Sequence, residues 1–255
     1  MKKNIFLEYG FHSDYQNRAR LIKEMGFDGV FLEWKDNLEE IAHIVRSEGL
    51  TIETIHLPFA LANSLWEDTD DGNTYYEQIK MGIMTASQLQ IKTVIVHTIR
   101  GLTPPPISSL GLKRMQELIE LARRKKVYIA LENIRMHQYI DYFYQNIDSP
   151  WLKFCFDAGH ANCFSQDIQH FAWHQYADKL VCVHLHDNEG LKDQHRLPFL
   201  GNINWEIVMH ELKINHYQGP LTLEVVLKTT EGLDEREFLA TAKQAIDQLE
   251  QLYDK

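Results

Sequence analysis

Short runs of apolar and β-branched residues alternate along this chain with longer segments in which apolar residues recur every three or four positions. Between two of the short runs, for example, Ile79, Ile83 and Ala86 have the spacing of one face of a helix. Residues 234–253 repeat this helical spacing near the end of the sequence. The short runs predict eight strands, at residues 4–9, 29–34, 51–57, 93–98, 127–133, 153–157, 180–187 and 221–226.

An alternation of eight strands with helices predicts an α/β protein, and specifically a closed parallel (β/α)8 TIM barrel. The length of 255 residues is close to the roughly 250 residues typical of such a barrel, so we expect residues 1–255 to form one domain. A doubly wound open sheet is the main alternative, but it usually carries a glycine-rich phosphate-binding turn after its first strand. Residues 9–13 contain a single glycine and do not match that pattern.

The formal net charge is −10, from 26 Lys and Arg against 36 Asp and Glu. Most of the non-specific affinity of proteins for DNA comes from Lys and Arg contacts with phosphates, so this charge disfavours nucleic acid as a partner. The sequence also lacks a run of 18 apolar residues and a signal-peptide stretch at its start. We therefore expect no membrane partner and a cytoplasmic location.

Polar residues suited to metal binding or acid/base chemistry stand at the ends of the third to eighth predicted strands. The carboxyl ends of the strands of a barrel converge on one face, where active sites form. Each single position has an ordinary alternative, because an isolated strand-end histidine is commonly just hydrogen-bonded within the fold. The candidates at the strand ends are His56, His97, Glu132, Asp157, His184, His186 and Glu224, and those in the segments that follow are His160, Asp193 and His195.

Several carboxylates that converge on one buried site repel one another unless a cation lies among them. The predicted cofactor is therefore a divalent metal ion. A mixture of oxygen and imidazole ligands suits Mn, Zn, Co or Mg, and the sequence does not choose among these four metals.

Many of these positions lie in short motifs that are similar to those of a known family. The motifs are residues 56–59, 96–97, 131–133, 156–162, 183–190, 193–205 and 223–224, and they span nearly the whole chain. In these motifs the chain resembles the xylose-isomerase-like TIM barrels. That family includes sugar and sugar-phosphate isomerases and epimerases, and also metal-dependent apurinic-site endonucleases.

The resemblance implies a specific chemistry for the sugar branch of the family. By this resemblance, one divalent ion is held by Glu132, Asp157, His184 and Glu224. Glu132 and Glu224 are implied to act as acid and base on a small sugar or sugar phosphate. One glutamate removes the proton next to the carbonyl, through a cis-enediolate, and the other returns it on the opposite face. Return of the proton to the neighbouring carbon would make the same site a 1,2-isomerase.

The endonuclease branch implies an alternative, a phosphodiesterase with a trinuclear zinc site. Its additional ligand positions fall on His56, His97, His160, Asp193 and His195, and all five carry the residue type that this branch requires. The negative net charge disfavours this alternative. So does the segment at 134–136, which lacks the small Thr-Ala-Gly stretch typical of those nucleases.

The chain also departs from the sugar branch of the family. Phe199 replaces a glycine that relatives commonly have, Asn204 stands where Asp is usual, and His186 occupies a place that many relatives fill with Lys. The altered 196–204 loop leaves open a third alternative, a barrel that binds metal or sugar without turnover. Relatives are often dimers or tetramers, so a homo-oligomer is also compatible with the resemblance.

Four further residues near the strand ends have two interpretations each. Glu33 ends the second predicted strand and suits either a pocket or a salt bridge. Phe59 and Trp66 follow the third predicted strand, where an aromatic ring either covers a sugar or simply packs in the fold. Arg100 follows the fourth and suits either a phosphate group or an acidic neighbour.

Overall fold

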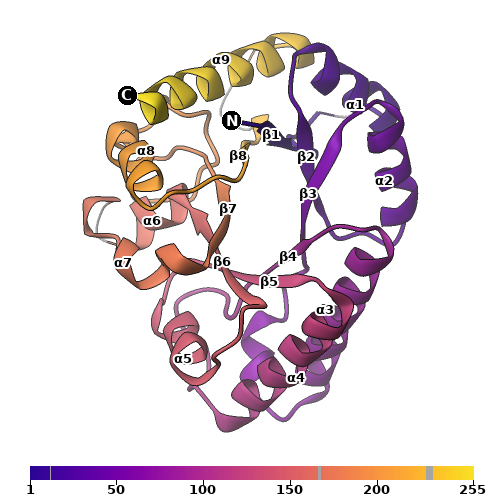
Figure 1. Ribbon diagram of the computed structural model, residues 1–255, viewed down its shortest axis with the longest axis vertical. Helices are drawn as coiled ribbons and strands as arrows, with labels where there is room; N and C mark the ends of the chain where they lie inside the picture. The colour runs from indigo at the N-terminus through magenta and orange to yellow at the C-terminus, as the bar shows by residue number, and fades with distance from the viewer. Residues whose placement is uncertain (12, 166–167, 228–231) are drawn as a thin grey trace.

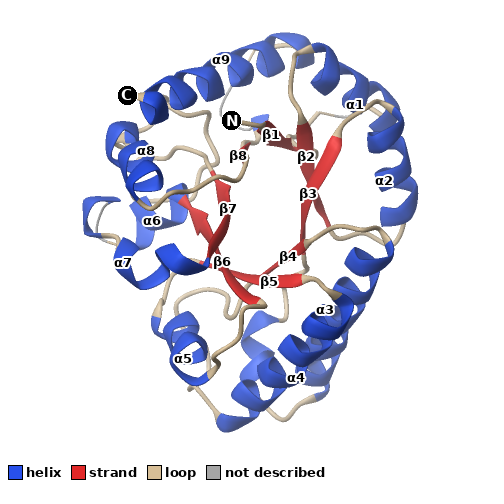
Figure 2. Cartoon of the chain, viewed as in Figure 1, coloured by secondary structure: helices blue, strands red, loops and turns tan. Residues whose placement is uncertain are grey.

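The computed structural model describes residues 1–11, 13–165, 168–227 and 232–255. Its strands form a ring that is enclosed by helices (Figures 1 and 2). The strands are β1 Lys3–Phe6, β2 Gly29–Glu33, β3 Thr51–His56, β4 Thr93–Val96, β5 Tyr128–Glu132, β6 Leu152–Asp157, β7 Leu180–His184 and β8 Leu221–Leu223.

The strand order and direction confirm the predicted (β/α)8 TIM barrel. The strands are hydrogen-bonded in the order β7-β6-β5-β4-β3-β2-β1-β8, and each neighbouring pair is parallel. A parallel bridge between Leu185 and Leu223 joins the two ends of this order. The sheet therefore closes on itself between β7 and β8, as Figure 2 shows.

The helices pack one apolar face on the outside of the strands. In α3, for example, Ile79, Ile83 and Ala86 are fully buried, as their spacing predicts. None of the described helices is both long enough and apolar enough to span a lipid bilayer. The α-helices are α1 Tyr15–Glu24, α2 Leu38–Ser47, α3 Asp70–Gln88, α4 Ser109–Lys125, α5 Gln138–Asn146, α6 Ala158–Phe164, α7 Trp173–Tyr176, α8 Trp205–Ile214 and α9 Glu235–Asp254; the 3-10 helices are η1 Ala62–Trp66, η2 Ile168–His170 and η3 Ala177–Lys179.

Several strands end earlier than the sequence predicts. The strands predicted at 93–98, 180–187 and 221–226 stop in the structure at Val96, His184 and Leu223. Beyond these points the backbone leaves the regular ladder and bonds to loops, as when the N–H of Val226 donates to the carbonyl of His195 at 2.9 Å. Of the apolar residues that extended the prediction, Leu185 and Val225 are instead fully buried in the core.

The barrel interior is closed below its mouth by a small apolar cluster of Ile95, Ala130, Cys155 and Cys182. A buried polar contact lies in the same interior. Glu53 accepts hydrogen bonds from Asn4 Nδ2 at 2.9 Å and from the Thr222 hydroxyl, and burial raises the pKa of this carboxyl. Side chains fill this interior, and in a TIM barrel the active site forms at the carboxyl-terminal mouth.

Candidate functional site

The inward face of the strands leads directly to the predicted metal ligands. Side chains two residues apart on a strand point to the same face, so each ligand continues the row begun by a residue of the interior cluster. Parallel pairing also places Asp157 level with His184 on the next strand. The inward-facing pairs are Ala130 and Glu132 on β5, Cys155 and Asp157 on β6, and Cys182 and His184 on β7.

The four residues implied as ligands of one ion come together in the structure. One ligand atom from each of Glu132, Asp157, His184 and Glu224 lies within 4.8 Å of the others, and we call these residues the central group. His184 Nδ1 lies 2.7 Å from Glu132 Oε1, 3.1 Å from Glu224 Oε2 and 4.0 Å from Asp157 Oδ2. The ring of Phe31 stacks on His184 at 4.6 Å and orients the imidazole.

A second group shares Glu132 with the central group. Ligand atoms of His56, His97 and Glu132 also lie within 4.8 Å of one another, and we call this the β3–β5 group. Glu132 Oε2 is 3.3 Å from His56 Nε2 and in direct contact with His97 Nε2. His56 Nδ1 donates to the carbonyl of Leu57 at 3.0 Å, which turns Nε2 toward the carboxylate.

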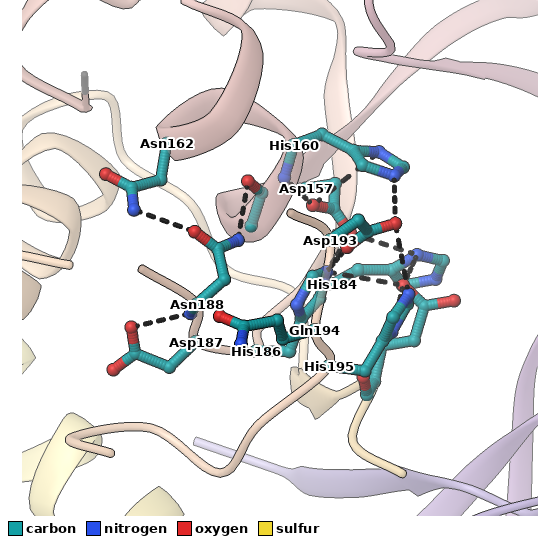
Figure 3. Close-up of polar contacts among 12 residues, drawn as sticks. Asp157, His160, Asn162, His184, His186, Asp187, Asn188, Asp193, Gln194 and His195 are labelled. Carbon is teal, nitrogen blue, oxygen red and sulfur yellow. Dashed lines mark hydrogen bonds and ion pairs between the residues drawn. The ribbon is translucent and has the colours of Figure 1, made fainter. Parts of the chain in front are cut away.

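A third group lies around Asp193, in the loop after β7. Asp193 Oδ2 is 3.2 Å from His160 Nε2 and 3.3 Å from His195 Nε2 (Figure 3). His195 Nδ1 donates to the carbonyl of Glu224 at 2.9 Å, which turns its Nε2 toward Asp193. Together with His186, these residues form what we call the Asp193 group.

His186 links the central group to the Asp193 group. Its Nε2 lies 3.1 Å from Asp157 Oδ2 and 3.7 Å from Asp193 Oδ1, and its ring stacks on His195 at 4.1 Å. The ring occupies the space beside Gly159, where an added Cβ would lie 1.9 Å from His186 Cε1. The glycine in the motif at 156–160 is therefore required by the position of His186.

Backbone contacts hold Asp157 in place. Its Oδ1 accepts a hydrogen bond from the N–H of His160 at 2.5 Å and so caps α6. Asn133, at the end of the neighbouring strand, makes paired hydrogen bonds to the N–H and the carbonyl of Asp157, at 2.7 Å and 2.8 Å. The sequence motif at 131–133 contains Asn133, but this positioning role becomes visible only in the structure.

The charges of the site depend strongly on one another. Burial would raise the pKa of Glu132, but the imidazoles of His184 and His97 outweigh burial and lower this pKa well below its usual value. Glu224 follows the same pattern, with His184 as the main cause of its lowered pKa. Burial would lower the pKa of His184, but Glu224 and Glu132 raise it well above its usual value. The carboxylates of the central group thus require a positive charge among them.

The residues of the central group fit a divalent metal ion. Three buried carboxylates face one imidazole nitrogen, and the protonated imidazole would supply only one positive charge against three negative ones. Oxygen and nitrogen ligands in this ratio suit a divalent cation of the predicted kind. The surroundings also contain buried polar atoms that have no hydrogen-bond partner among the described residues, namely His184 Nε2, His160 Nδ1 and Asp193 Oδ1.

Asp187 organises the loop that follows β7, and the sequence analysis missed this residue. Its carboxylate is fully buried and accepts four hydrogen bonds from the loop. The donors are the N–H groups of Asn188, Phe199 and Ile203 and the indole Nε1 of Trp205, at 2.9, 2.9, 3.2 and 2.9 Å. The side chain acts as a fixed centre around which the loop folds back on the mouth of the barrel.

The unusual residues of the 196–204 loop are accommodated in this structure. Phe199 has a φ of 72°, the left-handed conformation that explains why relatives commonly have glycine there. Its ring lies 6.1 Å from that of Trp205. Asn204 caps α8 by accepting a hydrogen bond from the N–H of Ile207 at 3.4 Å, a role that an Asp would also fill.

A cavity of about 440 Å³ lies over the site, within the usual size range of small-molecule pockets. Glu33, Phe59 and Arg100 line this cavity, so all three side chains lie at the pocket. Trp66 does not line it; instead the Trp66 indole donates to the carbonyl of Thr98 at 2.8 Å and packs within the fold. The residues of the site that line the cavity are His56, His97, Glu132, His160, Asp193, His195 and Glu224.

Comparison with known proteins agrees with this architecture. The model of a family described as xylose isomerase-like TIM barrel matches residues 19–252. The chain belongs to this family. Solved structures with the same fold include D-psicose 3-epimerase from Clostridium cellulolyticum H10, with a TM-score of 0.81 and 17% identity over 99% of both chains. At this identity the likeness establishes the fold alone.

Relatives found by sequence are 22–28% identical, and two of the three match only part of their own length. The chain is 28% identical over 191 residues to an uncharacterized protein of Methanocaldococcus jannaschii. This match covers 67% of this chain and 63% of that protein. A match to an uncharacterized protein of Sinorhizobium fredii covers only 34% of its length. The 3-dehydro-D-guloside 4-epimerase of Escherichia coli is 22% identical over 241 residues, with 84% of this chain and 88% of that enzyme covered.

Proposed function

We propose that this chain is a divalent-metal-dependent isomerase or epimerase of a small sugar or sugar phosphate, with Glu132 and Glu224 as its acid/base pair. The geometry of the two glutamates carries the proposal. Glu132 ends β5 and Glu224 follows β8, which are not neighbouring strands, yet the two carboxylates lie 2.7 Å and 3.1 Å from His184 Nδ1. Carboxylates that reach one point from different sides suit proton removal on one face of a carbon and return on the other.

The chain's own residues would perform the proton transfers. A metal held by Glu132, Asp157, His184 and Glu224 would supply Lewis acidity at the substrate carbonyl. Imidazoles contact both oxygens of Glu132 and fix the orientation of its carboxylate. Glu224 Oε1 makes no hydrogen bond or ion pair with any described residue, so this oxygen is available to the substrate. Phe59 beside His97 would shield the reacting carbons from water.

The named relatives support the substrate class. One is a 3-dehydro-D-guloside 4-epimerase and another is a D-psicose 3-epimerase. We infer a carbohydrate substrate for this chain from these names together with the size of the cavity.

The test is proton exchange between heavy water and a panel of ketoses and aldoses, catalysed by metal-loaded protein. Glu132→Gln and Glu224→Gln should each lower exchange by about a hundredfold or more, because a positioned acid or base contributes roughly that factor. Glu120→Gln, which changes an exposed glutamate on α4, is the matched control and should keep full activity. Full turnover in either site variant would refute the two-glutamate mechanism. Metal binding without exchange into any sugar would instead indicate a barrel that binds without turnover.

A second candidate function is an apurinic-site phosphodiesterase with three zinc ions. The specific observation in its favour is that the central group, the β3–β5 group and the Asp193 group each bring at least three possible ligands within 4.8 Å. The Nδ1 hydrogen bonds of His56 and His195 to backbone carbonyls also orient their Nε2 atoms toward these groups, as metal-binding histidines are oriented. Plasma mass spectrometry on protein purified without chelator separates the candidates. About three zinc ions per chain with cleavage of abasic duplex DNA would support the nuclease, and about one metal without cleavage would refute it.

A further inference from the structure

Two arginines form part of the wall of the cavity over the site. Arg100 follows β4 and Arg135 follows β5, and these strands are neighbours in the barrel. Ile99, Gly101 and Ile134 line the cavity beside them, so the two loops form one continuous wall. Of the described residues that line the cavity, these two arginines are the ones with a permanent positive charge.

Both guanidinium groups are free to bind a ligand. The Arg100 side chain makes no hydrogen bond or ion pair with any described residue, while its backbone is held to Asn63 by hydrogen bonds of 2.7 Å and 2.9 Å. Arg135 lies over the ring of Phe164 at 4.5 Å, and among the described residues its guanidinium likewise has no hydrogen-bond or ion-pair partner. Both positions are therefore fixed, but their donors are not used by the fold.

Two other arginines, by contrast, use their guanidinium groups to stabilise the fold. Arg18 is buried, and its guanidinium donates to the carboxylate of Glu8 and to backbone carbonyl groups. Arg114 is also buried, and it donates to the carbonyls of Leu65 and Glu67 and to Asn73. The contrast indicates that Arg100 and Arg135 are not needed to hold the loops together.

Four carboxylates also line the cavity and carry the opposite charge to the arginines. They belong to Glu33, Glu132, Asp193 and Glu224. A substrate with an anionic end would be repelled by these carboxylates and attracted by the arginine wall. The planar guanidinium group binds phosphate through two parallel hydrogen bonds, so two such groups suit one dianionic phosphate.

We propose that the cavity binds a phosphorylated sugar whose phosphate is held by Arg100 and Arg135, while the carbonyl end reaches Glu132 and Glu224. This inference rests on the proposed function, because it assigns the substrate class of the same site. It also sets the direction of the substrate, since the phosphate fixes which end of the sugar lies at the glutamates.

The experiment compares matched free and phosphorylated ketoses with the metal-loaded full chain, by the heavy-water exchange assay. Arg100→Gln and Arg135→Gln should each raise KM for the phosphorylated substrate by about tenfold or more, with little change in kcat or in KM for the free sugar. Arg124→Gln is the matched control, because it removes one exposed arginine at the end of α4 without touching the cavity. Arg135→Lys keeps the charge but not the paired donors, and should give an intermediate KM.

The outcomes separate this inference from the proposed function. Equal use of free and phosphorylated sugars, or equal effects of the arginine variants on both, would overturn the inference and leave the isomerase intact. If no sugar exchanges protons, the proposed function fails, and binding of glycerol phosphate by calorimetry still tests the arginine wall. Wild-type protein should then bind glycerol phosphate at least tenfold more tightly than the double variant that combines Arg100→Gln and Arg135→Gln. Equal affinity of the two proteins would overturn the inference.

Discussion

Replacement of Asp187 by Asn tests the view that this single carboxylate holds the loop after β7. The change keeps the size of the side chain but converts one acceptor oxygen into a donor. Oδ1 accepts from the N–H groups of Asn188 and Ile203, and Oδ2 accepts from the N–H of Phe199 and the indole of Trp205. Whichever way the new amide turns, its NH2 group meets two donors and both of those hydrogen bonds are lost.

The expected cost follows from the number of bonds that are lost. A hydrogen bond to a charged group contributes about 1.5–3 kcal/mol, so two of them contribute about 3–6 kcal/mol. Asp187 is fully buried, which leaves no water to replace the lost partners. For a chain of this size, 1 kcal/mol lowers Tm by about 2–4 °C, so we expect Tm to fall by at least about 6 °C.

Thermal unfolding followed by circular dichroism measures this effect, and urea unfolding provides a second estimate. Asp178→Asn is the matched control, because Asp178 is largely exposed and its ion pair with Lys179 contributes at most about 1 kcal/mol. A fall in Tm of less than about 2 °C for the Asp187 variant would show that the loop is held by other contacts. That result would refute the assignment of Asp187 as the residue that organises the loop.

Two further predictions concern the metal and the packing beneath it. Addition of chelator should lower Tm by about 8–16 °C, because a ligand present at a thousand times its Kd stabilises the folded state by about 4 kcal/mol. Return of the metal should restore Tm. An unchanged Tm would mean that no structural metal is bound. Gly159→Ala should displace His186, because the new Cβ would lie 1.9 Å from His186 Cε1. The variant should lower the free energy of unfolding by about 1–3 kcal/mol and weaken metal binding in a titration. Undiminished metal affinity in this variant would show that His186 does not influence the site.

The barrel and the central group could be predicted from the sequence for one physical reason. Barrel topology brings the ends of all strands to one mouth, whatever the loops do, so residues at strand ends are neighbours in space. For Glu132, Asp157 and His184 the strand pattern was therefore enough to place them together. The predicted fold and family are confirmed. The roles of the site residues, the single domain over 1–255, the cytoplasmic location and the homo-oligomer stay predictions.

The loop residues could not be predicted in this way. In the sequence, Asp187 is one more polar residue after a strand, and its four donors come from positions up to 18 residues further along the chain. His186 contacts both the central group and the Asp193 group only because Gly159 leaves room for its ring. The sequence did not predict Arg135 as a cavity residue, because nothing in the residues next to it in the chain indicates that its guanidinium lies over the ring of Phe164. Such contacts depend on loop conformation, which strand periodicity does not encode.

Closure of the barrel by β1 and β8 constrains how the protein is synthesised. Lys3 pairs with Leu221 and Asn4 with Thr222, so strands from the two ends of the sequence must meet. At 5–20 residues per second, β8 leaves the ribosome roughly 10–40 s after β1. During that interval the edge of β1 that faces β8 has unpaired backbone groups, and such an edge is a template for aggregation. Glu224 is the last member of the central group to be translated, so an ion can find all four ligands only in a chain that has been made through its final strand.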